Sequence, residues 1–304
     1  MTLYSLIHLA MALAGAPLLL GIVNRVKAKI GGRTGQPLLQ LYYDLAKLLR
    51  KGAVYSETTT WVFRAGPLVG LAAVIVALLV VPLGGLAAVA SFSGDLVLLA
   101  YMLGLMRLAT VLAALDTGSA FEGMGASREV QFAALAEPAM LLGLASLAAL
   151  TGKLSLSAIL AELSPASLPP LAAAALLLVA AAVFIVLLAE NSRIPFDDPN
   201  THLELTMVHE VMVLDHGGPD LAAIQYGAAL KLWAYAAVLS SIAIPIRTAW
   251  PACDLLVGAA GVVAIAVAAG LVESGMARLR MLRVPQLLLA AVVLSLLALV
   301  LVLR

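Results

Sequence analysis

The sequence predicts an all-α polytopic membrane protein with eight transmembrane helices. Of its 304 residues 63% are hydrophobic and only 12% are charged, and the mean hydropathy of +1.08 exceeds that of soluble globular domains. Its apolar runs are long enough, at about twenty residues each, to cross roughly 30 Å of hydrocarbon. They lack the alternating pattern of a barrel strand, and backbone groups in lipid must be paired within each segment, so helices are expected.

The first expected span, residues 3–23, has no basic residue before it, and its positive charges follow it. A secretory signal peptide shows the reverse order, so we interpret this segment as a retained span. No fixed-period repeat or low-complexity linker divides the chain, and residues 1–304 are expected to form one integral membrane domain. The other expected spans are approximately 67–89, 95–115, 132–150, 170–190, 224–246, 254–272 and 284–303.

The Lys and Arg residues of the loops predict the orientation. The loops at 24–65, 116–131, 190–223 and 273–283 hold thirteen of these residues, whereas the opposite loops and the C-terminus hold three. The positive-inside bias therefore places the long loops in the cytoplasm and both termini on the outer side. Segment 38–51 of the first loop has one apolar and one polar helical stripe, so a helix lying on the membrane surface is expected there.

Three charged residues fall in or beside the apolar spans. Glu137 lies in the fourth span, Glu190 closes the fifth, and Arg107 lies toward the cytoplasmic end of the third. An ionised side chain in hydrocarbon costs at least about 2.5–3.5 kcal/mol unless it is paired, hydrated or neutralised. Glu137 and Glu190 are therefore candidates for a proton relay, since carboxylates in partly dry sites titrate closer to neutral pH. The alternative is a static pair in which Arg107 locks helices together, and pairing is the role expected for Arg107 itself.

The acid-rich segment 190–220 also contains three histidines, His202, His209 and His216, which recur every seven residues. Steps of about 10.5 Å along a helix are too long for three ligands of one metal ion, so titratable surface or partner-contact histidines are expected. The single Cys253 forms neither a cluster nor a disulfide framework within the chain. The sequence contains no recognised nucleotide or nucleophile motif, so no catalytic residue, metal site or cofactor is expected in this chain.

Three blocks of sequence resemble subunit 1, or the H subunit, of respiratory complex I and the matching membrane subunit of energy-converting NiFe hydrogenases. They are NRVKAKIGGRTGQPLLQLYYDLAKLLRK at 24–51, GMGASREVQFAALAEP at 123–138 and AENSRIPFDDPNTHLEL at 189–205. The third is close to the family signature AE-x-x-R-x-PFD. Together with the expected spans, the resemblance covers nearly the whole chain.

The resemblance implies that the chain seats a soluble redox arm on the membrane and begins a series of buried acids that links redox chemistry to ion translocation. Residues at matching positions in the first loop, together with an arginine of the third block, would form ion pairs with other side chains or support the loops. The matching residues are Arg25, Arg33, Gln40, Asp44 and Lys47 in the first loop, Arg193 in the third block, and the acids Glu137, Glu190, Asp197 and Glu204.

Two departures separate this chain from the quinone-reducing members. Arg33 leads into TGQP where those members typically have R-x-GPN, and His202 stands where they usually have another acid. The run THLELTMVHEVMVLDHGGPDL is instead similar to the formate hydrogenlyase and hydrogenase-4 branch. The resemblance then implies Glu210 as a further relay acid, and it implies that Asp198, His202, His209 and Asp215 face the hydrogenase arm.

The implied function is that of a membrane subunit of a group 4 NiFe hydrogenase or formate hydrogenlyase in a prokaryotic cytoplasmic membrane. The NiFe centre and iron–sulfur clusters would lie in partners, namely the hydrogenase large and small subunits and an iron–sulfur subunit, with antiporter-like subunits beside the chain. Three alternatives stay open. They are the quinone-chamber subunit of an NADH:quinone oxidoreductase-like complex, a free-standing proton-coupled transporter, although repeated halves are absent, and a pure anchor for the soluble arm. The net charge of +1 gives no sign of nucleic-acid binding.

Overall fold

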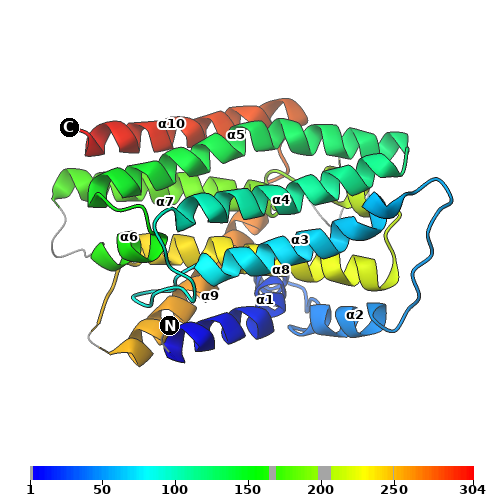
Figure 1. Cartoon of the computed structure of the whole chain (residues 1–304), viewed down its shortest axis with the longest axis horizontal. Helices are drawn as coiled ribbons and strands as arrows, with labels where there is room; N and C mark the ends of the chain where they lie inside the picture. Colours follow the sequence, from blue (N-terminus) through cyan, green and yellow to red (C-terminus); the bar gives the residue numbers. More distant parts are fainter. Residues whose placement is uncertain (1–2, 164–168, 198–206, 249) are drawn as a thin grey trace.

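The computed structural model describes residues 3–163, 169–197, 207–248 and 250–304. This part of the chain is helical apart from turns, loops and one isolated bridge. The long helices form one elongated bundle, with both termini toward the same end (Figure 1). The elements are α1 Leu3–Ile30, α2 Gln40–Leu48, α3 Trp61–Val80, α4 Asp95–Asp116, α5 Ala120–Thr151, α6 Leu156–Glu162, α7 Pro170–Glu190, the 3-10 turn η1 Glu210–Val213, α8 Gly218–Ala243, α9 Pro251–Gly275, the 3-10 turn η2 Met281–Arg283 and α10 Val284–Val302.

Seven helices of the described chain are long and apolar enough to cross a membrane, and they coincide with seven of the eight expected spans. Some of their limits differ from the expected ones. The second span, expected at 67–89, is α3 and ends at Val80, because the residues that follow it form an irregular connection to α4. The fourth, expected at 132–150, is part of α5, which begins at Ala120 because the polar segment before the apolar run is also helical.

The sixth expected span, 224–246, falls on α8, which is not among the seven apolar helices. Its 26 residues are enough to cross about 30 Å of hydrocarbon. It packs against α1, α2, α3, α7 and α9, and seventeen of its residues are buried. Because neighbouring helices cover it, α8 needs no lipid-facing apolar stripe and accommodates Lys231.

Small residues and a cap fix α4 against α3. The carboxylate of Asp116, at the end of α4, accepts the backbone N–H groups of Thr60 and Phe63 at 2.7 and 3.2 Å, which satisfies free donors at the start of α3. A Cβ atom at Gly66 of α3 would lie 2.8 Å from the side chain of Ala113, so the two helices approach closely at this glycine. This close packing holds α4 in the rotation that turns Arg107 toward α5 and α7.

Helix α2 lies next to α1 and α8. The Tyr42 hydroxyl donates to the carbonyl of Ala14 in α1. Figure 1 shows α2 running along the bundle. The expected helix is therefore present and packs against α1 and α8, and its position on the membrane surface stays a prediction.

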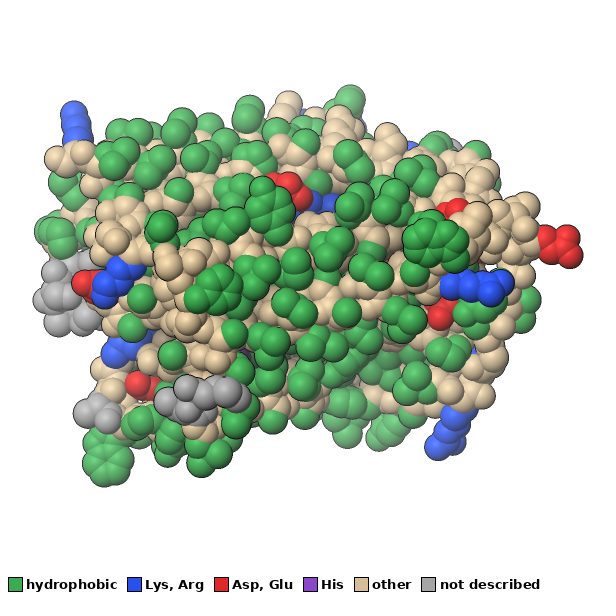
Figure 2. Space-filling view, viewed as in Figure 1, with side chains coloured by type: hydrophobic (Ala, Val, Ile, Leu, Met, Phe, Trp, Pro, Cys, Tyr) green, Lys and Arg blue, Asp and Glu red, His purple; other side chains and the backbone are tan. Residues whose placement is uncertain are grey.

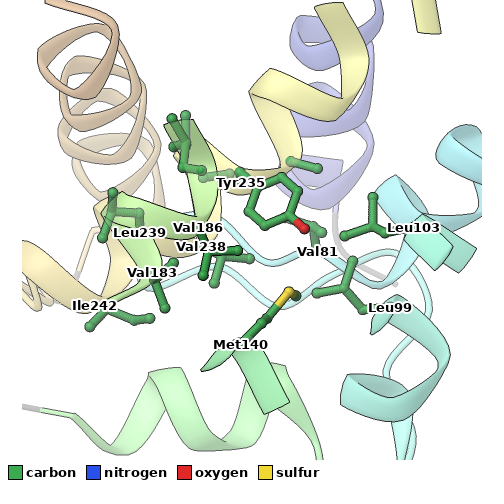
Figure 3. Close-up of a cluster of buried hydrophobic side chains, with 14 of the residues drawn as sticks. Val81, Leu99, Leu103, Met140, Val183, Val186, Tyr235, Val238, Leu239 and Ile242 are labelled. Atoms are coloured by element: carbon green, nitrogen blue, oxygen red, sulfur yellow. The ribbon is translucent and has the colours of Figure 1, made fainter. Parts of the chain in front are cut away.

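A close-packed, largely aliphatic core fills the space between α4, α5, α7 and α8 (Figure 3). These parts of the four helices lie toward the end of the bundle that holds the termini in Figure 1. Its members include Leu99 and Leu103 of α4, Met140 of α5 and Val183 of α7. The cavity left among these side chains and those of α8 is only about 10 Å³, at the lower limit for one water molecule. This part of the bundle is therefore apolar and almost without voids.

Candidate functional site

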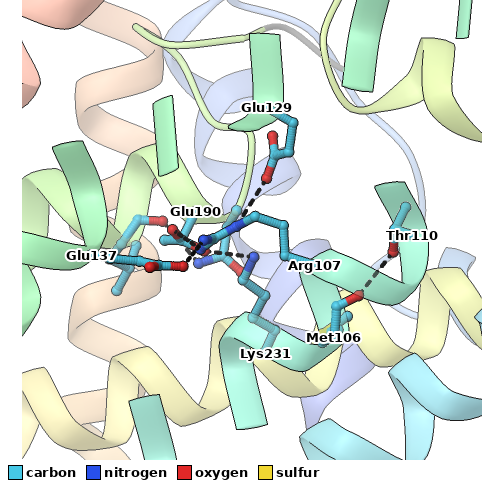
Figure 4. Close-up of polar contacts among 9 residues, drawn as sticks. Met106, Arg107, Thr110, Glu129, Glu137, Glu190 and Lys231 are labelled. Atoms are coloured by element: carbon cyan, nitrogen blue, oxygen red, sulfur yellow. Dashed lines mark hydrogen bonds and ion pairs between the residues drawn. The ribbon is translucent and has the colours of Figure 1, made fainter. Parts of the chain in front are cut away.

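Arg107 of α4 lies at the centre of a group of charged side chains, most of which are buried (Figure 4). One of its guanidinium nitrogens, Nη1, donates to Glu137 of α5, and the other, Nη2, donates to Glu190 at the end of α7. Its Nε atom lies 3.4 Å from the carboxylate of Glu129, a second acid of α5. A single cation therefore contacts acids from two other helices, α5 and α7.

Lys231 of α8 extends this group beyond Glu190. Its Nζ atom lies 2.9 Å from Oε2 of Glu190, whose Oε1 accepts from Arg107. Glu190 is thus held between two cations that belong to different helices. We call Arg107, Glu129, Glu137, Glu190 and Lys231 the charge cluster.

Most of the charge cluster is withdrawn from solvent. The side chains of Arg107, Glu190 and Lys231 are 7%, 3% and 5% exposed. The pairs compensate the cost of placing charges in an apolar bundle, so the presence of each charge depends on the others. Removing one member of such a buried pair typically costs about 3–5 kcal/mol, because the other is left unpaired.

A cavity of about 480 Å³ is lined by Glu190 and Lys231 of the charge cluster and by residues between α1 and α2. Gln36 and Pro37, which line its mouth, are exposed, whereas Glu190 and Lys231 are buried. Several polar side chains line the space between them, so water, an ion or a small ligand has a polar route to the inner pair of the charge cluster. These residues include Gln40, Asp44, Arg193, Asp197, His209, Glu210, His216 and Gln225.

Asp197, expected as a relay acid, holds the segment that follows α7. Its Oδ1 atom lies 2.8 Å from a guanidinium nitrogen of Arg278. Its Oδ2 atom accepts the backbone N–H groups of Val208 and His209 at 3.1 and 3.3 Å. Asp197 therefore joins the segments around residues 197, 208 and 278, and it also lines the cavity.

Arg193, the expected loop arginine, faces Glu273 of α9 at 3.5 Å. The same carboxylate lies 2.7 Å from Nζ of Lys27 in α1. The Glu273 side chain is fully buried, so two cations compensate one acid at the joint between α1, α9 and the loop. This group supports the loop and lies apart from the charge cluster in the pattern of ion pairs.

The first-loop residues make mostly local contacts. Arg25 donates to the carbonyl of Thr34 at 2.8 Å, which closes the turn after α1. Gln40 donates to Asp44 at 2.9 Å within α2, and both line the cavity. Arg33 and Lys47 are exposed.

The expected residues of the long acidic loop lie at different depths. His209 and Glu210 are half-buried and line the cavity, whereas Asp215 is exposed. The structure thus places two of them on the route to Glu190 and one on the surface. Asp198, His202 and Glu204, for which roles were also expected, lie outside the described residues.

His216 fixes the end of this loop. Its ring stacks on Phe63 at a centroid distance of 3.9 Å, with an angle of 7° between the planes. The neighbouring backbone N–H of Asp215 donates to Glu122 at 3.3 Å. Burial lowers the pKa of His216 and also that of His209, so both rings favour the neutral form. The expectation of a surface histidine is wrong for His216, because its ring packs against α3.

Five members of these ion-pair groups had no role in the sequence interpretation: Lys27, Glu129, Lys231, Glu273 and Arg278. Lys231 was visible as a cation inside an apolar run, which is the signal that identified Arg107. Glu129 lies in the polar segment before the expected fourth span, and its membership follows only from the early start of α5. Glu273 stands at the end of an apolar run, where a surface position was equally compatible with the sequence.

A helical bundle that buries charged side chains among apolar candidate spans is typical of a polytopic membrane protein. The chain matches the family described as NADH dehydrogenase over residues 3–303. It is 31% identical over 288 residues to hydrogenase-4 component C of Escherichia coli (strain K12), covering 93% of this chain and 90% of that protein. The chain therefore belongs to the NADH dehydrogenase family of complex I subunit 1 proteins, which confirms the resemblance inferred from its motifs.

Two further similarities agree with this assignment. Formate hydrogenlyase subunit 4 of Escherichia coli (strain K12) is 37% identical over 141 residues, which span about half of each protein, 46% in both cases. A chain from the structure of the membrane-bound sulfane sulfur reductase, an archaeal respiratory membrane complex, has the same fold. The TM-score is 0.81 at 24% identity, over 97% of this chain and 98% of that one.

Proposed function

We propose that this protein is the membrane subunit of an energy-converting group 4 NiFe hydrogenase or formate hydrogenlyase. It anchors the soluble redox arm and couples electron transfer there to the movement of protons or Na⁺. The supporting observation is the charge cluster, two members of which line a cavity that also carries several polar side chains, in a chain 31% identical to hydrogenase-4 component C. The NiFe centre and the iron–sulfur clusters belong to the large, small and iron–sulfur subunits, and antiporter-like subunits complete the membrane part.

The pairing of Glu190 gives the coupling a physical basis. A proton bound to Glu190 would leave two cations, Arg107 and Lys231, without their shared acid. Arg keeps its proton in proteins, whereas a buried Lys is able to release one. Proton uptake at Glu190 is therefore coupled to proton release at Lys231, and a change of charge beside the cavity shifts this exchange.

The acids of the long loop supply the route into the cluster. Glu210 lines the cavity, and Glu204 is the further relay acid implied by the family motif. Asp197 takes part by holding the loop, since its two oxygens are occupied by Arg278 and two backbone donors. Beyond Glu190 the next acid of the relay is Glu137, and Arg107, which keeps its own proton, holds both carboxylates on one guanidinium. Electron transfer in the soluble arm acts on this route by changing charge or conformation around residues 190–220.

The same proposal includes the membrane topology. α8 is the sixth of eight spans and is surrounded by other helices of the bundle. The cavity and its loops face the cytoplasm, and both termini lie on the outer side of a prokaryotic cytoplasmic membrane, as the distribution of Lys and Arg predicts. The arm would then dock where the cavity opens.

Purification of the tagged chain in mild detergent tests the assignment. We expect mass spectrometry to find a NiFe hydrogenase large subunit and membrane partners, and we expect the preparation to evolve hydrogen. A preparation that reduces quinone and lacks nickel would reject the hydrogenase assignment. A single chain that transports ions by itself would reject membership in a redox complex.

The cavity favours one second candidate function, the quinone-chamber subunit of a respiratory complex. Its volume of about 480 Å³ is within the range of small-molecule sites, and part of its lining is apolar, including Leu41 and Met106. Quinone reduction that is blocked by a competitive inhibitor, together with loss of activity in Met106→Trp, would support this candidate. Hydrogen evolution unaffected by quinone analogues supports the hydrogenase assignment instead.

A further inference from the structure

Glu137 is the one member of the charge cluster that is largely uncovered. Its side chain is 51% exposed, compared with 7% for Arg107 and 10% for Glu129. Figure 2 shows acidic and basic atoms meeting in the middle of a largely hydrophobic surface, on the face that α3, α4 and α5 form in Figure 1. The charge cluster therefore extends from the interior of the bundle to its lateral surface.

The position of Glu137 along the bundle places it far from both membrane surfaces. A Cβ atom at Gly104 of α4 would lie 3.6 Å from Glu137 Oε1, so the carboxylate is level with that residue. Gly104 is nine residues from the start of α4, or about 14 Å along the helix. Since the hydrocarbon layer is about 30 Å thick, the Glu137 carboxylate faces its middle.

The side chains around Glu137 offer no second polar contact. Along α4 the exposed residues Tyr101, Leu105 and Leu108 follow one helical stripe, and Leu141 continues the surface on α5. Within the described residues, Arg107 is the one side chain that hydrogen-bonds or ion-pairs with Glu137. A carboxylate facing acyl chains in this way costs several kcal/mol unless another group covers it.

The charges of the cluster indicate which group is missing. Its three carboxylates, on Glu129, Glu137 and Glu190, face two cations, Arg107 and Lys231. With every group ionised the cluster has one negative charge in excess. Glu137 is the member through which the cluster reaches the surface of the bundle. A group that neutralises this charge cannot approach through the end of the bundle that holds the termini, because the aliphatic core fills the space between that end and the cluster.

We propose that the face of α4 and α5 around Glu137 is the docking surface for a transmembrane helix of a neighbouring membrane subunit, and that this helix brings a Lys or Arg side chain to the Glu137 carboxylate. The partner cation neutralises the excess charge and covers the carboxylate. Two residues beside Glu137, Gly104 and Ala134, have small or no side chains, which allows a helix to approach closely. The proposal rests on the proposed membership in a membrane complex, and it does not require proton transfer.

Site-specific photocrosslinking in native membranes tests this docking surface. Leu108→p-benzoyl-phenylalanine and Leu141→p-benzoyl-phenylalanine place the reactive group beside Glu137 and leave that residue intact. Leu289 of α10, which is as exposed as Leu108 and lies on another helix, is the matched control position. We expect both test positions to link to one membrane subunit, through a peptide with Lys or Arg within a helical turn of the linked residue.

A charge exchange completes the test. Glu137→Lys is expected to lower the yield of the Leu108 crosslink by at least roughly tenfold, and replacement of the partner's basic residue by Glu is expected to restore it. Glu137→Gln is the milder variant if the lysine variant fails to insert. Crosslinks to lipid alone, or to a helix without a basic residue, would overturn the docking proposal when the hydrogenase subunits still co-purify. Absence of those subunits from the same preparation would reject the proposed function instead.

Discussion

Arg107 of α4 donates to both Glu137 and Glu190, so one guanidinium joins helices α4, α5 and α7. The residues it joins are 30 and 83 positions away in the chain. A planar group with several fixed donors suits this position, because Lys presents a single point charge. The stability of the bundle and the placement of its titratable groups therefore depend on the same side chain.

Replacing this cation is expected to be costly. Arg107→Gln leaves Glu190 paired with Lys231 alone and leaves Glu137 without its partner, so a loss of about 3–5 kcal/mol is predicted. The measurement is thermal unfolding of the purified complex in mild detergent. Lys153→Gln is the control, since its pair with Glu162 is about half exposed and should contribute less than about 1 kcal/mol. Equal effects of the two variants would show that the buried pairs do not stabilise the fold.

The pair of Glu190 and Lys231 should behave as a unit. Glu190→Gln leaves a buried lysine uncompensated on that side, and Lys231→Met leaves the acid with Arg107 only. The double variant removes both charges, so its loss of stability should be smaller than the sum of the single losses, by roughly 0.5–3 kcal/mol. Thermal unfolding of the four proteins measures this coupling. Strict additivity would mean that the two groups do not interact in the membrane.

Residues 207–217 of the acid-rich segment pack closely against Gly125 of α5. A Cβ atom at this position would lie 2.9 Å from the carbonyl oxygen of Val208 and 3.0 Å from the side chain of Met212. Gly125→Ala is therefore expected to displace residues 207–217 and to increase their hydrogen exchange. Gly123→Ala on the same helix meets nothing within 4 Å, and by helix propensity it should stabilise by up to about 1 kcal/mol. Similar exchange in both variants would contradict the described packing.

The buried ring of His216 is expected to make the packing of residues 207–217 depend on pH. Burial lowers the pKa of the packed ring below the ordinary 6.5, so the displaced loop binds protons more readily than the packed one. The nearby acids Asp215 and Asp220 oppose this effect in part. The contribution of His216 to the stability of the packed loop is thus fully present above pH 6.5, and it is lost as the pH falls below this value toward the lower pKa of the packed ring.

Hydrogen exchange at about pH 7.5 and pH 5.5, corrected for its intrinsic pH dependence, measures this loss. His216→Phe keeps a ring stacked on Phe63 and removes the titrating group. We expect the pH dependence to weaken in this variant, and the remainder is expected from His209, whose pKa burial also lowers. An unchanged pH dependence would contradict the role of His216.

The apolar runs predicted most of the fold because in lipid the composition of a segment decides whether it spans the membrane. α7 has the predicted limits 170–190, since its run begins at a proline and ends at a charge. α5 extends to Ala120 because helical structure continues beyond the apolar part, and hydropathy does not detect that extension. α8 is less apolar because other helices, and not lipid, surround it.

The charge cluster was only partly predictable for a related reason. Charges inside apolar runs point to a buried site, and Glu137, Glu190 and Arg107 gave that signal. Which of these charges pair depends on how α4, α5, α7 and α8 are rotated against one another. Arg107 and Glu190 are 83 positions apart, so no local sequence pattern indicates that they pair. Glu129 and Lys231 joined the cluster only when the packing of α5 and α8 was known.

The most direct test of the coupling role compares ion movement with electron transfer in the same reconstituted complex. The purified complex is placed in lipid vesicles, and internal pH or Na⁺ and hydrogen formation are followed together for the wild type and Lys231→Met. The exchange between Glu190 and Lys231 predicts that the variant still forms hydrogen and that its ions moved per hydrogen molecule fall by at least roughly tenfold. An unchanged ratio in Lys231→Met would contradict the coupling role of the charge cluster.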